Sequence, residues 1–209
     1  MRLCRRPTPA GVSDSCAFLS SSRIRSRRAF WEPPTAGSSR LLRRAVTRST
    51  TSILYAEKFD PVLSAYQMGC YLDVSQNARE VETDVERLRA ACALALIFPV
   101  WFDGLPAIMQ GYFQRVFLPG VSTTLDENGA FHPNLGNLKR MAAVCTYGER
   151  RATVAKKRDP ALRFVRDNIR ALIDPNGPFE HLAIFGMDFS TAPRRAAFLR
   201  RVSRAFAGW

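Results

Sequence analysis

The stretch Phe98–Gly120, FPVWFDGLPAIMQGYFQRVFLPG, decides the fold of this chain, because an apolar strand, an aromatic loop and an amphipathic helix follow one another there. The strand begins upstream, and Cys92–Phe98 is seven apolar residues without a charge, which is typical of a strand covered by helices on both faces. Pro99 cannot donate a ladder hydrogen bond, so the strand must end there. Open α/β sheets bind ligands at the carboxyl ends of their strands, which makes Val100–Gly104 a candidate ligand loop.

Alternating elements continue on both sides of this stretch. Apolar positions at helical spacing predict helices over residues 80–89, 106–117, 161–172 and 193–206. Apolar runs at 141–145 and 181–185 predict two more buried strands, and residues 123–137 have the composition of a turn-rich loop. Strands that alternate with helices indicate an α/β fold, a parallel sheet with helices on both faces, of which three strands are clear.

The first 52 residues differ in composition from the rest. They hold eleven arginines, no lysine and two acids, Asp14 and Glu32, so they carry +9 of the chain's net charge of +13. They also contain ten serines and no sustained period of 2 or 3.6 residues, and Pro33-Pro34 stops a helix. This composition predicts disorder, so we divide the chain into a basic segment, residues 1–52, and one domain, residues 53–209.

Composition also argues against several classes of protein. The longest apolar run has seven residues, far short of the roughly eighteen that a membrane span needs. Five cysteines, an odd number without a C-x-x-C pair, predict neither a disulfide framework nor a zinc site. His132 and His181 stand alone in the sequence and do not predict a metal site. Unpaired cysteines are typical of a reducing compartment, so we expect a cytoplasmic protein.

The stretch Phe98–Val116 resembles the flavodoxin-like family of NAD(P)H:quinone oxidoreductases. Members carry a motif like F-P-x-W-[WF]-x-G-[LM]-P-A-I-[LM]-[KQ]-G-[WY]-F-[DEQ]-R-V at this place, and the chain follows it with few departures. Further similar pieces are LYAEKFDPVLSA at 54–65, CTYG at 145–148 and HLAIFGMDFSTAPRRAAFLRRV at 181–202. The resemblance therefore runs from Leu54 to the end, and it is far more specific than a lone glycine motif.

This resemblance implies a flavodoxin-like fold of five strands, with an enzyme that passes reducing equivalents from NAD(P)H through FAD or FMN to a quinone or similar acceptor. It implies a homodimer whose second subunit closes the pocket. It also implies two flavin-binding loops, formed by Pro99, Val100, Trp101 and Phe102 along the ring and by Cys145, Thr146, Tyr147 and Gly148 on its pyrimidine side. Cys145 stands where relatives often have threonine, which removes one hydroxyl. No catalytic proton donor is assigned, because residues 150–158 hold neither tyrosine nor histidine.

Each candidate residue also has a purely structural interpretation. Trp101 and Phe102 could be core aromatics that cap a strand, and Thr146 with Gly148 could form an ordinary turn. Asp103 would be a solvated loop carboxylate. The basic residues of 150–158 would be a solvated face, or they could steer the phosphates of NAD(P)H.

The resemblance leaves the basic segment unexplained. Relatives have a first strand, a phosphate loop of the type H-P-x-x-x-S-F, a first helix and a second strand in this place, and nothing in residues 1–52 is recognisable as any of them. Three explanations stay open: a misread or lost half-unit, a transit peptide that would give an organellar location, or a basic arm for nucleic acid or an anionic membrane. Nucleic acid is disfavoured, because only Phe18, Phe30 and Trp31 offer stacking rings. An inactive, flavin-free interaction module is the alternative to an active reductase.

Overall fold

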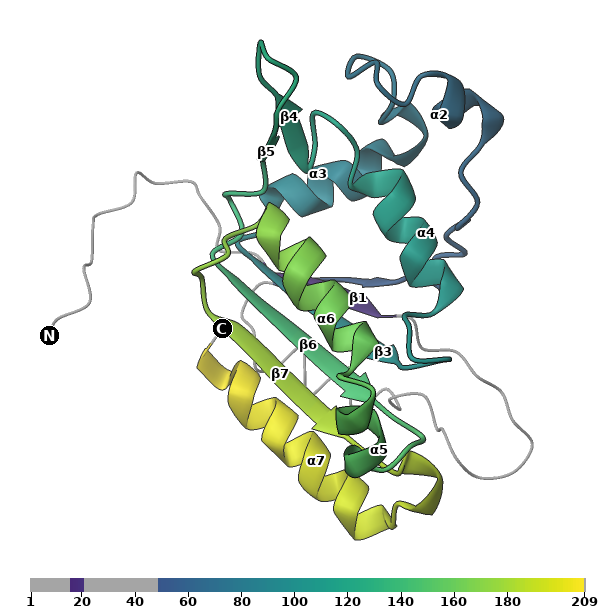
Figure 1. Cartoon of the computed structure of the whole chain (residues 1–209), viewed down its shortest axis with the longest axis vertical. Helices are drawn as coiled ribbons and strands as arrows, with labels where there is room; N and C mark the ends of the chain where they lie inside the picture. Colours follow the sequence, from purple (N-terminus) through teal and green to yellow (C-terminus); the bar gives the residue numbers. More distant parts are fainter. Residues whose placement is uncertain (1–15, 21–48, 209) are drawn as a thin grey trace, which may run out of the picture.

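The computed structural model describes residues 16–20 and 49–208. A five-stranded parallel sheet with the order β2-β1-β3-β6-β7 lies at its centre (Figure 1). The strands are β1 (Cys16–Ser20), β2 (Ser49–Ile53), β3 (Ala93–Pro99), β6 (Arg140–Thr146) and β7 (Phe179–Ile184). This order is one of the two common doubly wound arrangements, so the predicted parallel α/β fold is confirmed.

Two of these strands lie in the segment in which we expected no recognisable strand. β1 pairs in parallel with both β2 and β3, which puts residues 16–20 inside the sheet. The expected boundary between residues 52 and 53 falls within β2. The expectation is therefore wrong at these two places, because five-residue strands flanked by serines and arginines are too short to show a period. The expectations of disorder, of a missing phosphate loop and of a transit peptide concern residues 1–15 and 21–48, which lie outside the described residues.

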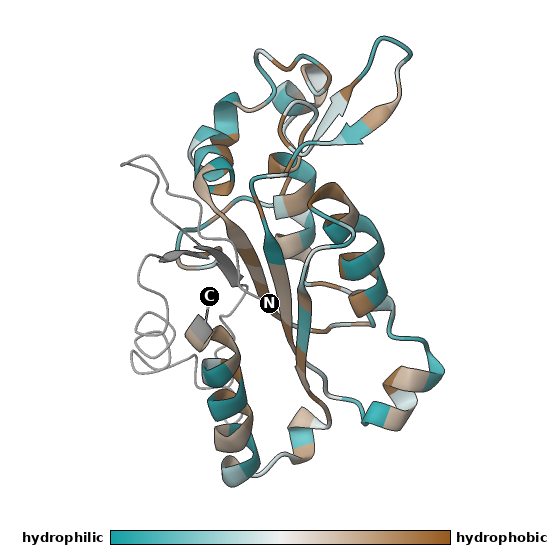
Figure 2. Cartoon of the chain, turned by 90° about the vertical axis from the view of Figure 1, so that its left-hand side faces the viewer, coloured by the Kyte–Doolittle hydropathy of each residue, from teal (hydrophilic) through white to brown (hydrophobic). Residues whose placement is uncertain are grey.

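Helices cover both faces of the sheet (Figures 1 and 2). On one face lie α3 (Glu82–Ala90), α4 (Ala107–Val116) and α6 (Pro160–Phe164). On the other face lies α7 (Ala192–Ala205), which begins at the Thr191 N-cap. The side chains of β3 alternate between the two cores: Leu94, Leu96 and Phe98 join the larger one, and Ala93 and Ala95 join Val202 and Phe206 under α7. This alternation explains why the strand is apolar at every position.

The other predicted elements agree with the structure, apart from two. The predicted helix 161–172 is instead α6 followed by a π-turn at Val165–Ile169 and a 3₁₀ turn at Arg170–Leu172. The predicted loop 123–137 contains a small antiparallel hairpin, β4 (Thr123–Leu125) with β5 (Phe131–Pro133). Strands of three residues, most of them exposed, leave no hydrophobic pattern, which is why the sequence shows only their turn. No helix within the described ranges is long and apolar enough to cross a membrane.

One buried arginine holds the segment between β2 and α3, residues 54–81, against α4. Arg115 is 7 % exposed, and its guanidinium donates to Gln67 Oε1 at 2.9 Å and to the Asp60 carbonyl at 2.7 Å. A third N–H group meets Glu80 Oε2 at 3.0 Å. Gln67, which is also buried, donates in return to the Arg115 carbonyl at 2.8 Å. These four residues form the Arg115 cluster, which fixes α2 (Ala65–Gly69) and its flanking loops on α4.

Candidate functional site

The two loops predicted to bind a ligand lie side by side at the carboxyl edge of the sheet. β3 and β6 are neighbours, and Pro99 pairs in register with Thr146. The Val100 amide continues the ladder by donating to the Thr146 carbonyl at 2.8 Å. The helix α5 (Arg151–Lys156) follows the second loop at the same edge (Figure 1). The structure thus brings together two segments that lie more than forty residues apart in the chain.

The first loop is a tight turn that presents two aromatic rings to solvent. The amide of Trp101 donates to the Gly104 carbonyl at 3.1 Å, and the Gly104 amide returns a bond of 2.8 Å. Phe102 and Asp103 at the tip both have positive φ, 47° and 60°, as in a two-residue hairpin turn, although neither is a glycine. Trp101 is 49 % exposed and Phe102 is fully exposed, so neither ring is a core residue.

The second loop turns its side chains inward. Cys145 and Tyr147 are buried, and burial raises the pKa of both groups, so both are neutral at pH 7. The Tyr147 ring stacks on Phe185 at 4.6 Å, and its hydroxyl lies 3.0 and 2.9 Å from the two carboxylate oxygens of Asp159. Only backbone, together with half-buried Thr146, is left to meet a ligand from this loop.

The exposed groups of both loops complement a flavin. The amides of four residues make no hydrogen bond to any described group, and these residues are Phe102, Asp103, Gly148 and Glu149. An isoalloxazine has flat apolar faces and one edge of carbonyl and nitrogen acceptors, so exposed rings beside free N–H donors match both parts. This complementarity concerns only the isoalloxazine ring of a flavin, because the expected position of a phosphate-binding loop lies outside the described residues.

An ion-pair network joins the two loops, and sequence reasoning missed it. Lys157, just after α5, lies with its Nζ 2.9 Å from Asp103 Oδ2 and 2.9 Å from Glu149 Oε1. The hydrogen bond to Asp103 raises the pKa of the Lys157 ammonium most, and the hydrogen bond to Glu149 raises it further. Asp103 was expected to be a solvated carboxylate. The partners are 54 residues apart, so no local pattern in the sequence could reveal the pair.

Other histidine and aromatic side chains lie away from the loops or in the core. His132 pairs with Asp126 at 2.9 Å on the β4–β5 hairpin. His181 on β7 is half-buried, and burial lowers the pKa of its imidazole. Tyr112 and Phe113 are buried in the core between α4 and the sheet. Within the described residues, no group of three or more His, Cys, Asp or Glu side chains could hold a metal ion.

A doubly wound parallel sheet with this strand order is the arrangement of flavodoxin-like proteins. Residues 39–204 match the family described as having a flavodoxin-like fold, and the chain belongs to that family. The match begins upstream of β2, in agreement with the strand that the structure places there.

Two curated proteins are similar to parts of the chain. NAD(P)H dehydrogenase [quinone] 1 of Cavia porcellus is 28 % identical over 126 residues, which are 51 % of this chain and 44 % of that protein. An uncharacterized NAD(P)H oxidoreductase of Haemophilus influenzae is 31 % identical over 101 residues, which are 46 % of each chain. The chain thus spans less than half the length of the curated relatives it matches.

Solved structures show the same fold over nearly the whole chain. Smu.1420 of Streptococcus mutans superposes with a TM-score of 0.74 at 20 % identity, covering 93 % of this chain and all of that one. An NAD(P)H:quinone oxidoreductase of Methanothermobacter marburgensis superposes with a TM-score of 0.72 at 20 % identity, covering 94 % of this chain and 98 % of that one. Identities this low establish a shared fold and nothing more.

Proposed function

We propose that this protein is a flavin-dependent oxidoreductase that passes reducing equivalents from NAD(P)H to a quinone. The observation that carries the proposal is the adjoining pair of loops at the carboxyl edge of β3 and β6, with exposed rings and free amides. The similarity to proteins named NAD(P)H dehydrogenase [quinone] 1 and NAD(P)H oxidoreductase supports it from the sequence side.

The residues of the two loops have separate tasks in this proposal. A bound flavin supplies the redox chemistry, because it exchanges hydride with NAD(P)H and electrons with an acceptor. Trp101 and Phe102 would cover an apolar face of the ring, and Pro99 with Val100 would fix the start of their loop. Cys145, Thr146, Tyr147 and Gly148 would contribute backbone, with the Gly148 amide as a donor toward charge that builds on the reduced ring.

FMN is the cofactor that we would test before FAD. Two solved structures with the same fold contain FMN: an NADH-azoreductase of Bacillus anthracis, with a TM-score of 0.67, and general stress protein 14 of Treponema denticola, with a TM-score of 0.54. The first of these is named for azo reduction, so azo compounds are acceptors to test beside quinones.

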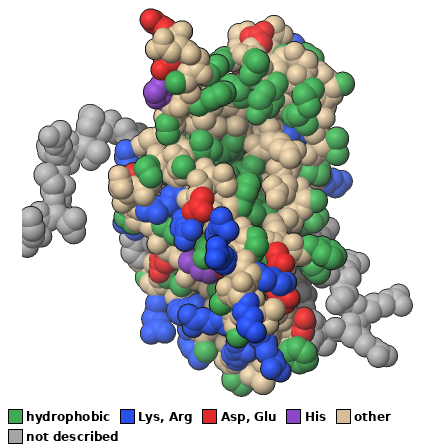
Figure 3. All heavy atoms as spheres, in the orientation of Figure 1, with side chains coloured by type: hydrophobic (Ala, Val, Ile, Leu, Met, Phe, Trp, Pro, Cys, Tyr) green, Lys and Arg blue, Asp and Glu red, His purple; other side chains and the backbone are tan. Residues whose placement is uncertain are grey.

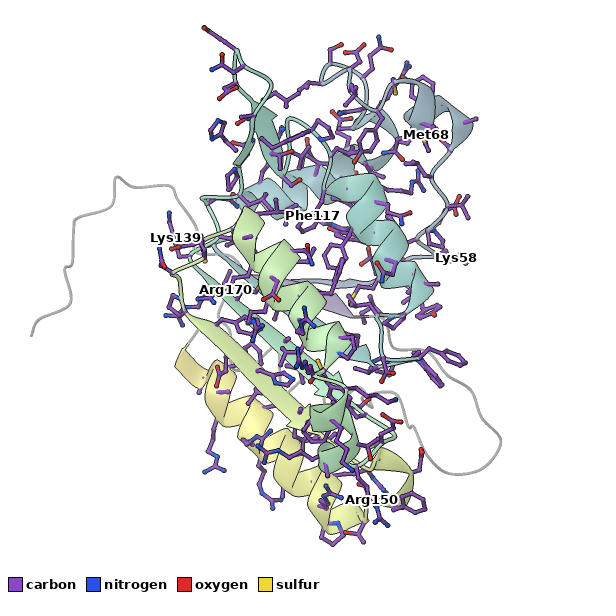
Figure 4. The ribbon with its side chains drawn as sticks, viewed as in Figure 1. Lys58, Met68, Phe117, Lys139, Arg150 and Arg170 are labelled. Carbon is purple, nitrogen blue, oxygen red and sulfur yellow. The ribbon has the colours of Figure 1, made fainter. Side chains whose placement is uncertain are left out.

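The charge distribution supports NAD(P)H as the electron donor. Residues 139–206 contain 15 Lys and Arg against 6 Asp and Glu, whereas residues 54–138 contain 5 against 10. The basic side chains gather on one half of the visible face, over α5, α6 and α7 (Figure 3). Arg150, labelled in Figure 4, is the N-cap residue of α5 and lies two residues after Gly148 of the second loop. A positive field around the loops would attract the phosphates of a dinucleotide.

We also propose a homodimer. The segment 62–74 exposes five large apolar side chains: Tyr66 is 41 % exposed, and Val62, Met68, Leu72 and Val74 are between 58 % and 71 % exposed. Met68, labelled in Figure 4, lies on α2 at the opposite end of the molecule from Arg150. Such a concentration of exposed apolar surface marks a place for a second chain. Cys70, Cys92 and Cys145 are free thiols, which suits a reducing compartment such as the cytoplasm.

The flavin content of the purified protein tests the proposal. Absorbance at the flavin bands, before and after addition of excess FMN or FAD, should report about one flavin per chain. Bleaching of these bands by NADPH or NADH, followed by their recovery on addition of a quinone, would complete the cycle. A colourless protein that takes up neither flavin would reject the reductase, and it would support the flavin-free interaction module instead.

A further inference from the structure

Lys157 occupies an unusual position, because a single side chain contacts both candidate flavin loops. Its Nζ lies 3.2 and 2.9 Å from the two carboxylate oxygens of Asp103 in the loop after β3. The same Nζ lies 2.9 and 3.1 Å from the two carboxylate oxygens of Glu149 in the loop after β6. We call these three residues the Lys157 bridge.

Two members of the Lys157 bridge, Asp103 and Lys157, lie in or beside backbone turns of an uncommon conformation. Asp103 follows Phe102 in a turn with φ of 60° and 47°, and Lys157 precedes Arg158 and Asp159 with φ of 59° and 43°. Residues other than glycine rarely adopt such angles, and they keep them only where surrounding contacts hold them. The bridge supplies such a contact between the two turns.

A second contact anchors the turn that follows Lys157 to the core. Asp159 accepts the hydrogen bond of the Tyr147 hydroxyl, and it also caps α6 by accepting from the Leu162 amide at 3.1 Å. Tyr147 is fixed by its stack on Phe185. The turn that carries Lys157 is therefore rigidly attached to β6, whereas the Phe102–Asp103 turn has backbone hydrogen bonds only at its base.

All three members of the bridge are partly exposed, with side chains between 35 % and 44 % accessible. Exposed ion pairs contribute little to global stability and weaken as salt screens them. The bridge is therefore poorly placed to stabilise the fold, but it is well placed to restrain the tip of one loop relative to the other.

We propose that Lys157 is a positioning residue that sets the spacing of the two loops and thereby presents Phe102 and the free amides to the flavin ring. The proposal rests on the proposed function, since it assumes that these loops bind flavin. Without the bridge, the aromatic turn would sample more orientations, and flavin binding would have to order it. The neighbouring Lys156 is exposed and has no ion pair with a described residue, so it offers a matched control.

The first test needs no flavin. Hydrogen exchange of the Trp101 and Gly104 amides, which close the turn, should be at least about threefold faster in Lys157→Met than in the wild type or in Lys156→Met. Lys157→Arg should restore slow exchange, because it keeps the charge at a similar reach. Equal exchange in all four proteins would overturn the bridge as a restraint on the loop, whatever the protein binds.

The second test measures flavin affinity by fluorescence titration with FMN. The FMN Kd should rise roughly threefold or more in Lys157→Met, with Lys156→Met and Lys157→Arg close to the wild type. Raising salt from about 0.1 M to about 1 M should weaken binding more in the wild type than in Lys157→Met, because the Debye length falls from about 10 Å to about 3 Å. An unchanged Kd in Lys157→Met would refute the proposal, whereas a wild type that binds no flavin would reject the proposed function and leave the exchange result to judge the bridge.

Discussion

Replacing Arg115 with methionine is a stringent test of how the segment 54–81 is held. The methionine keeps much of the apolar stem but removes three side-chain hydrogen bonds, to Gln67 Oε1, the Asp60 carbonyl and Glu80 Oε2. Gln67 is fully buried, so its oxygen would lose its donor without gaining water. Each buried acceptor left unpaired costs about 1–3 kcal/mol. Glu80 is 34 % exposed and can be rehydrated.

We therefore expect Arg115→Met to lower the free energy of unfolding by about 3 kcal/mol. This is the lower end of the loss of about 3–5 kcal/mol that is typical when one partner of a buried ion pair is removed. Urea unfolding followed by circular dichroism would measure this, and a fall in Tm of about 6–12 °C should accompany it. Arg79→Met is the matched control, because Arg79 is exposed and lies in the same segment. A loss below about 1 kcal/mol for Arg115→Met, or an equal loss for the control, would refute the reasoning.

Three further changes test other parts of the molecule. Gly111→Ala should lower the free energy of unfolding in urea by about 1–3 kcal/mol, because the new Cβ would lie 2.2 Å from the facing backbone oxygen of Pro61. In the control Gly136→Ala, the new Cβ meets nothing within 4 Å, so the free energy of unfolding should change by less than about 0.5 kcal/mol. Burial lowers the pKa of His181 below 6.5, so the unfolded chain binds this proton more readily, and stability should fall as pH drops below about 6.5. His181→Gln should flatten this part of the pH–stability profile, and an unchanged slope would contradict the assignment. Phe102→Ala should leave the free energy of unfolding within about 0.5 kcal/mol of the wild type while weakening FMN binding. Phe131→Ala, which removes an exposed ring from the distant hairpin, is the control. An equal loss of FMN affinity in both variants would show that the Phe102 ring has no specific role in binding.

The parts of the fold that sequence could predict are those with strong local patterns. The residues from Cys92 to Val116 predict β3, its loop and α4, and the structure confirms all three elements. The loop after β6 follows from a second buried run, and its position beside the first loop follows from the parallel order of the strands. In contrast, β1 and β2 are short and lie among arginines and serines, so composition pointed to disorder.

The contacts that position the candidate site could not be predicted, because they join distant parts of the chain. Arg115 appears in the sequence as an ordinary polar residue of an amphipathic helix, yet it is buried against residues 35 and 48 positions away. Tyr147 is predicted to belong to a ligand loop, but its sequence position does not reveal that its ring stacks on Phe185 and its hydroxyl bonds to Asp159. A hydrophobic pattern records which face is buried, but it does not record which polar groups meet there.

The unequal division of charge between the two halves of the domain has a consequence for how copies of the protein meet. A net of +9 on residues 139–206 and of −5 on residues 54–138 gives this part of the chain a large electric dipole. At low ionic strength, such dipoles attract head to tail, and a head-to-tail contact does not close on itself as a two-fold dimer does. Turbidity or broad elution in dilute buffer would then report open chains of molecules. Sedimentation at about 0.15 M salt, where the Debye length is about 8 Å, is the condition under which a symmetric dimer can be distinguished from them.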